Sequence, residues 1–91
     1  MKTLIKVQKR HINGGERNNP WTCPIACAVK ELVGAEYASM VSVSSQAIQF
    51  GAGVNGIELP QNAQAFIENF DEQQPVKPFR FTLDVPAAIL K

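Results

Sequence analysis

The clearest structural signal in this chain is a strict alternation of apolar and polar residues near its C-terminus. Residues Phe79 to Val85 read FRFTLDV, which is the period of a strand with one buried and one exposed face. Such a strand is stable only beside other strands and under a layer that covers its apolar side. The alternation therefore requires a sheet in whatever fold the chain adopts.

Three further segments carry strand signals. Thr3 to Lys9 alternates in the same way, with Ile5 and Val7 on its apolar side. Glu36 to Ser44 alternates again, and Ala47 to Phe50 gives a short strand after the tight connection at 44–46. We expect these last two segments to form a hairpin.

Two helices are expected between the strands. The first begins at Thr22 or Cys23, because the proline that follows suits a first helical turn, and it stops before Gly34, a residue able to take a left-handed cap. At 100° per residue its apolar stripe lies opposite the two cysteines and the lysine of the helix. The second helix runs from Pro60 to about Asp71. The residues it buries are Ala63, Phe66, Ile67 and Phe70.

The resulting order is βαββαβ, which predicts a ferredoxin-like α+β fold: a two-layer sandwich in which two helices cover one face of a four-stranded antiparallel sheet. Residues 1–91 form a single domain in this interpretation. The apolar tail at 86–91 docks on the domain or on a second copy. The open face of the sheet would carry a mixture of apolar and polar side chains, which suits a dimer surface or a shallow binding platform.

Composition narrows the function. The chain is 45% hydrophobic and 19% charged, which is typical of a folded domain and not of a disordered one. A net charge of +1 gives little attraction for nucleic acid, and no segment approaches the ~20 apolar residues of a membrane span. We therefore expect a cytoplasmic protein that binds neither nucleic acid nor membrane, and a homo-oligomer, since 91 residues bury only a marginal core.

Residues 10–22 show no hydrophobic period, and a long irregular connection in so small a domain tends to be functional. Glycines permit close backbone approach, arginines pair with phosphate oxygens, asparagines bond a ribose or base edge, and a helix N-terminus offers free N–H groups. We expect an anion or nucleotide site here, although a polar loop with a tryptophan anchor remains an alternative. The candidate ligand-binding residues are Arg10, His11, Gly14, Gly15, Arg17, Asn18, Asn19, Trp21, Thr22 and Cys23.

Other chemistries have weaker signals. Cys23 at a helix start and the upstream His11 would suit a thiol nucleophile, but no Asp or Asn is placed to orient the histidine. Cys23 and Cys27 lack the second ligand pair of a zinc site. The carboxylates of the second helix read as a solvated face. We expect no catalytic residue, no metal and no cofactor.

Five motifs taken together resemble a known group. They are HIxxG (11–15), CPIAxA (23–28), VxV (41–43), LPx5FIx2FD (59–71) and PFRF, of the form PFxF (78–81). This set resembles small uncharacterised proteins encoded by bacteriophages and prophages. The resemblance implies a place in the host cytoplasm and a counter-defence role, since phage proteins of this size include sponges that sequester the nucleotide signals of bacterial immunity.

Two hypotheses of function follow from these features. The first is a non-enzymatic protein that captures a phosphorylated, nucleotide-derived small molecule as a homo-oligomer. The alternative is a protein-interaction module that inhibits a host factor through the open sheet face or the C-terminal tail at Ile89 and Leu90.

Overall fold

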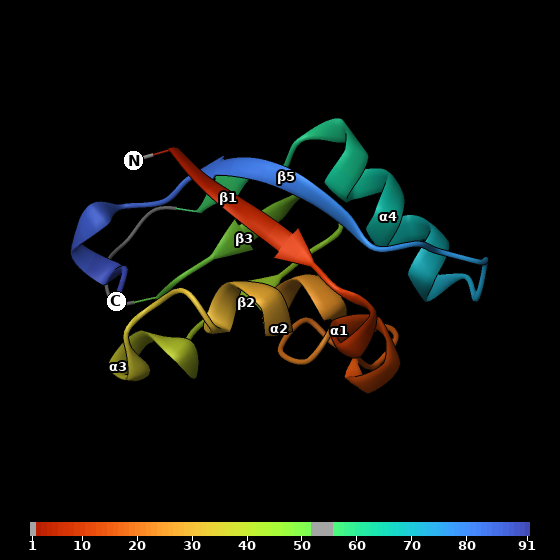
Figure 1. The fold of residues 1–91 in the computed structure, drawn as a ribbon, viewed down its shortest axis with the longest axis horizontal. Coiled ribbons are helices and arrows are strands. Elements are labelled where there is room, and N and C mark those ends of the chain that lie inside the picture. Colours follow the sequence, from red (N-terminus) through yellow and green to blue (C-terminus); the bar gives the residue numbers. More distant parts are fainter. Residues whose placement is uncertain (1, 52–55) are drawn as a thin grey trace.

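The computed structural model describes residues 2–51 and 56–91. Within them the chain is a mixed α+β domain (Figure 1). Its elements in chain order are β1 (Lys2–Val7), α1 (Lys9–Gly14), α2 (Pro24–Lys30), α3 (Ala35–Ala38), β2 (Ser42–Val43), β3 (Ala47–Gln49), β4 (Ile57–Glu58), α4 (Gln61–Asp71), β5 (Phe79–Asp84) and a 3-10 turn (Ala87–Ile89).

The two strongest strand predictions are confirmed and are paired with each other. β1 and β5 form an antiparallel ribbon whose register runs from Lys2 opposite Asp84 to Val7 opposite Phe79. Ile5 and Phe81 face each other across the ribbon, and both are buried. The alternation therefore sets which face of the ribbon meets the core.

The predicted four-stranded sheet is wrong. Among the described residues the strands form two antiparallel sheets, β1–β5 and β2–β3–β4. The hairpin between β2 and β3 is confirmed, with Val43 opposite Ile48. However, only Ser42–Val43 of the strand expected at Glu36 to Ser44 forms a strand, and the start of that segment belongs to the short helix α3.

Local hydrogen bonds explain why α3 replaces a strand. The Gly34 carbonyl accepts bonds from the N–H groups of both Tyr37 and Ala38, which closes a helical turn directly after α2. Ala and Glu in this turn are good helix formers. The alternation that begins at Glu36 therefore does not set the structure of its first residues, where these local hydrogen bonds form a helical turn.

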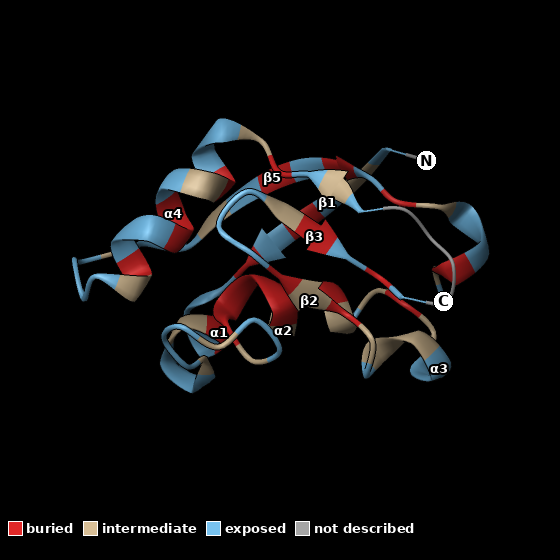
Figure 2. Cartoon of the chain, turned by 180° about the vertical axis from the view of Figure 1, so that it is seen from behind, coloured by how far each residue is buried: buried red, intermediate tan, exposed pale blue. Residues whose placement is uncertain are grey.

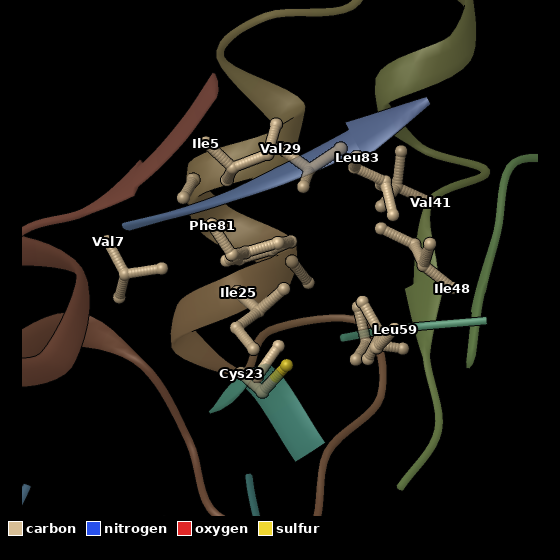
Figure 3. Close-up of a cluster of buried hydrophobic side chains, with 14 of the residues drawn as sticks. Ile5, Val7, Cys23, Ile25, Val29, Val41, Ile48, Leu59, Phe81 and Leu83 are labelled. Atoms are coloured by element: carbon tan, nitrogen blue, oxygen red, sulfur yellow. The ribbon is translucent and has the colours of Figure 1, made fainter. Parts of the chain in front are cut away.

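The core lies between the β1–β5 ribbon, α2 and the second sheet (Figure 3). Ile25 and Val29 of α2 reach the middle of it and are fully buried, as is Ile48 of β3. α4 begins at Gln61 with Pro60 as its N-cap and buries all four predicted residues, so this helix is confirmed in place and in orientation.

The C-terminal tail docks on the domain itself. Ile89 is buried, Leu90 pairs with Val33 in an isolated bridge, and the Ile89 carbonyl accepts the Gly34 N–H at 2.8 Å. The expected left-handed cap at Gly34 is wrong, because Gly34 has φ −60° and serves as the N-cap of α3. α2 ends earlier, with Glu31 as its C-cap. The glycine-rich sequence between β3 and β4, which predicts a loop, falls largely on 52–55, outside the described residues.

Candidate functional site

The segment expected to be an irregular loop begins with a helix. In α1 the Gln8 N–H donates to His11 Nδ1 at 2.8 Å, while the Gln8 carbonyl accepts the His11 and Ile12 N–H groups. This is the reciprocal logic of a capping box, with His in the place of Glu or Gln. His11 is 4% exposed, so it contributes to packing and its Nδ1 is occupied as an acceptor.

His11 also belongs to a charged cluster that joins α1 to the end of α2. Glu31 accepts bonds from the two terminal guanidinium nitrogens of Arg10, Nη1 and Nη2, the one from Nη2 being 2.8 Å long. Glu31 Oε2 lies 3.1 Å from His11 Nε2 but off the line of a regular hydrogen bond. The Arg10 bond is the main reason that the pKa of Glu31 falls to about 2. Arg10 is thus already paired with a carboxylate, which leaves it less available to an anionic ligand.

Cys23 occupies the N-terminus of α2. It is the N-cap, with extended backbone angles and no side-chain hydrogen bond to the helix. Its side chain is 6% exposed, among the apolar side chains of the core (Figure 3). Burial raises the pKa of its thiol above the ordinary value, while the backbone N–H groups of Ala26 and Ile25 oppose this rise. The start of α2 is thus covered by a buried, protonated thiol.

The expected position of Cys23 opposite the apolar stripe is wrong for a simple reason. The rule of 100° per residue holds only inside a helix, and an N-cap residue has non-helical angles. Cys27, which is inside α2, is half-buried, and its sulfur contacts the Thr22 carbonyl at 3.4 Å. Burial also raises the pKa of the Cys27 thiol.

A tight turn carries the tryptophan. The Asn19 carbonyl accepts the N–H groups of Thr22 and Cys23, and its side-chain oxygen accepts the Trp21 N–H at 3.0 Å. Lys30 donates to the Trp21 carbonyl. The Trp21 side chain is 49% exposed, so the turn is held at four points while the indole projects into solvent.

The loop between α1 and this turn is fixed to α4. The Asn18 N–H donates to Asp71 Oδ1 at 2.9 Å, and Asn18 has a positive φ of 56°. The Arg17 guanidinium lies 5.7 Å from the centre of the Phe70 ring. Gly15 packs so closely on Pro24 that a Cβ there would be 2.7 Å from the proline ring. Contacts to both helices thus hold the loop.

A hollow of about 390 Å³ opens between α1, this loop and the C-terminal end of α4. Arg17 and the amides of Asn13 and Gln74 supply polar groups. No carboxylate in the described residues lies within ion-pair distance of Arg17. The remaining lining residues are Ile12, Gly15, Phe70 and Val76.

A second hollow, of about 430 Å³, opens on the other side of the Asn18–Asp71 contact. It lies between α4 and the β2–β3 turn, and Glu68, Asp71 and Glu72 give it negative character. The sequence predicts only that these carboxylates form a solvated face of the helix. Their i, i+3, i+4 spacing places them together on α4, but the turn that faces them is brought there only by tertiary folding.

The ten predicted ligand residues therefore do not form one site but lie in several separate parts of the structure. Arg17 and Gly15 line the first hollow. Asn18 lines the second hollow, and Asn18, Asn19 and Cys23 line a smaller one that shares Asp71 with it. Arg10 and His11 belong to the Glu31 cluster, and Trp21 projects into solvent. The two remaining residues are Thr22, which donates to Glu16 at 3.2 Å, and Gly14, which has open space around its Cα.

Comparisons with known proteins return no match, whether against family models, curated proteins or solved structures. No described helix is long and apolar enough to cross a membrane. In the same part of the chain, no three His, Cys, Asp or Glu side chains gather in a way that would hold a metal ion. Any function must therefore be argued from the two hollows and the exposed surface.

Proposed function

We propose that this protein is a non-enzymatic binding protein that captures a phosphorylated small molecule in the hollow between α1 and α4. One observation carries the proposal: Arg17, with no carboxylate partner among residues 2–51 and 56–91, lines a hollow of about 390 Å³. A planar guanidinium is suited to bidentate phosphate binding. The volume lies within the range of small-molecule sites.

The other groups in this hollow fit the same ligand. The amides of Asn13 and Gln74 can donate to phosphate or sugar oxygens, and Ile12 and Val76 offer apolar contact to the rest of the molecule. The Arg17 stack on Phe70 orients the guanidinium before a ligand arrives, which lowers the entropic cost of binding. A nucleotide-derived signal of the kind implied by the phage resemblance is the first ligand to test.

Thermal-shift screening followed by calorimetric titration tests the proposal, with cyclic nucleotides and ADP-ribose derivatives as probes. A ligand at about 100 times its Kd stabilises a protein by about 2.7 kcal/mol, which raises Tm by roughly 10 °C or more in a domain of this size. We expect Arg17→Ala to abolish this shift. Lys77→Ala removes the same charge from an exposed position outside the hollow and should retain it.

Two outcomes would contradict the proposal. One is a well-folded protein that no phosphorylated probe stabilises. The other is an Arg17→Ala variant that binds as tightly as the wild type.

The alternative function, inhibition of a host protein, has less support at one of its two surfaces. Ile89 is buried and Leu90 is half-buried against the domain, so the C-terminal tail is occupied by the protein's own fold. The outer face of β1–β5 is exposed and remains open to a partner.

A further inference from the structure

The outer face of the β1–β5 ribbon carries two cations that repel each other. Lys6 and Arg80 are direct cross-strand partners, and both side chains are exposed. Like charges in this position destabilise a sheet, since the Cβ atoms of such a pair lie about 5 Å apart. Neither residue has a carboxylate within ion-pair distance in the described part of the chain.

The C-terminal end of α4 carries two anions that repel each other. Glu68 lies in the last turn of the helix and Glu72 is the C-cap, whose N–H donates to the Glu68 carbonyl at 3.1 Å, and both side chains are exposed. Like charges at i and i+4 repel, and carboxylates are unfavourable at the negative end of the helix dipole. No basic residue lies in that turn, and no described cation pairs with either glutamate.

The two pairs match in charge and in spacing. Cβ atoms at i and i+4 of a helix lie about 5–6 Å apart, close to the separation of the cross-strand cations. The two pairs also lie on different sides of the molecule. Lys6 and Arg80 are on the ribbon, in front of β3 in Figure 1 and behind it in Figure 2, whereas the glutamates face the β2–β3 turn.

An exposed apolar side chain accompanies the cations, and a hollow lies beside the glutamates. Leu4, two positions before Lys6 on the same face, is 46% exposed, and it is one of two large apolar side chains left in solvent among the described residues. Beside the glutamates, the hollow of about 430 Å³ has Ile67 among its lining residues. A surface that meets this hollow through Leu4 would bury apolar area and join the charge pairs in one contact.

We propose that this protein associates head to tail with copies of itself, the Lys6 and Arg80 pair of one copy docking on the Glu68 and Glu72 pair of the next. The contact is heterologous, because it joins two different surfaces, and it therefore builds rings or open chains and not closed dimers. It does not depend on ligand capture, since Arg17 is part of neither surface.

Sedimentation velocity over a range of protein concentrations tests this inference. At about 0.01 M salt the Debye length is about 30 Å, and at about 1 M it is about 3 Å. We expect a sedimentation coefficient that rises with concentration at low salt and falls to the monomer value at high salt. Wild-type protein that remains monomeric throughout would overturn the proposal, without recourse to any variant.

Charge reversal then assigns the surfaces. Lys6→Glu with Arg80→Glu, and separately Glu68→Lys with Glu72→Lys, should each be monomeric, while an equimolar mixture of the two variants should associate. A variant with Lys77→Glu and Lys91→Glu has the same net charge as the Lys6→Glu, Arg80→Glu variant but is altered outside both surfaces, and it should still associate. Circular dichroism and Tm confirm that each variant is folded. A mixture of folded variants that stays monomeric would refute the assignment.

Discussion

Two adjacent glycines give opposite expectations for the same substitution. Gly14 is the last residue of α1, and a Cβ built on it meets no heavy atom within 4 Å. Gly15 is the C-cap, and its Cβ would lie 2.7 Å from Pro24 Cδ and 2.8 Å from Pro24 N. Both have negative φ, since Gly51 is the one described glycine with a positive φ. The difference between them is therefore steric and not conformational.

The magnitudes follow from this geometry. Carbon atoms pack at about 3.5–4.0 Å, and the atoms facing Gly15 belong to a rigid ring and to the backbone at the start of α2. Relief requires the loop to move against the helix, so we expect Gly15→Ala to destabilise the fold by about 1–3 kcal/mol, as overpacking does. Gly14→Ala gains helix propensity and loses unfolded-state entropy, which stabilises by about 0.5 kcal/mol at a helix end.

Thermal and urea unfolding monitored by circular dichroism measure both effects. At roughly 4–8 °C per kcal/mol for a domain of this size, Tm should fall by at least 4 °C in Gly15→Ala and rise by a few degrees in Gly14→Ala. The reasoning fails if Gly15→Ala is as stable as the wild type, or if Gly14→Ala is the less stable of the two.

Three further predictions concern charge, backbone and sulfur. Arg10 is the main cause that lowers the pKa of Glu31 from 4.5 to about 2, so this contact contributes stability that is complete above about pH 4.5 and is lost as the pH falls toward 2. The Tm of the wild type should therefore exceed that of Glu31→Gln above pH 4.5, and the difference should vanish as the pH falls to 2. At Asn18, whose φ is 56°, Ala should lower the urea-unfolding free energy by about 1 kcal/mol, while Gly should leave it equal or higher. Iodoacetamide followed by mass spectrometry should label the half-buried Cys27 before the buried Cys23; faster labelling of Cys23 would instead revive the thiol-nucleophile hypothesis.

Periodicity predicted the elements whose stability comes from one extended apolar face. β1, β5 and α4 each present a repeated pattern to the core over at least six residues, and each was located from the sequence to within two residues of its bounds. The hairpin of β2 and β3 also followed from its turn. The pattern could not show that the strands separate into two sheets, because that depends on which partners meet in space.

α1 was missed because its sequence lacks the usual signals of a helix start. The sequence KRHING contains Asn and Gly, and no Ser, Thr, Asp or Asn stands at the N-cap. What holds it is a histidine acting in a capping box and the contact of Arg10 and His11 with Glu31, one residue beyond the end of α2. A capping motif defined by Ser or Thr with Glu would not detect this arrangement.

The candidate site was predicted in composition but not in geometry. The concentration of Gly, Arg, Asn and Trp at 10–22 led to the prediction of a site in this segment, but the segment begins with α1, and a partner of its loop, α4, lies about fifty residues further along the chain. The Asn18–Asp71 bond spans 53 positions, and no spacing rule within one element reaches that far. Phe70, Gln74 and Val76 of the first hollow could be assigned only after folding.

The contacts of this loop also decide which of its residues are free to act. Gly15 is held against Pro24, Asn18 against Asp71, and Asn19 in the turn before α2, so substitutions at these positions report on stability before they report on binding. Arg17 differs, because its stack on an aromatic face is worth only about 0.5–1 kcal/mol at an exposed site and leaves its N–H groups toward solvent. A ligand that replaced water on those N–H groups would need no change in the loop. Binding lost in Arg17→Ala without a comparable loss of stability is therefore the result that would separate a functional arginine from a structural one.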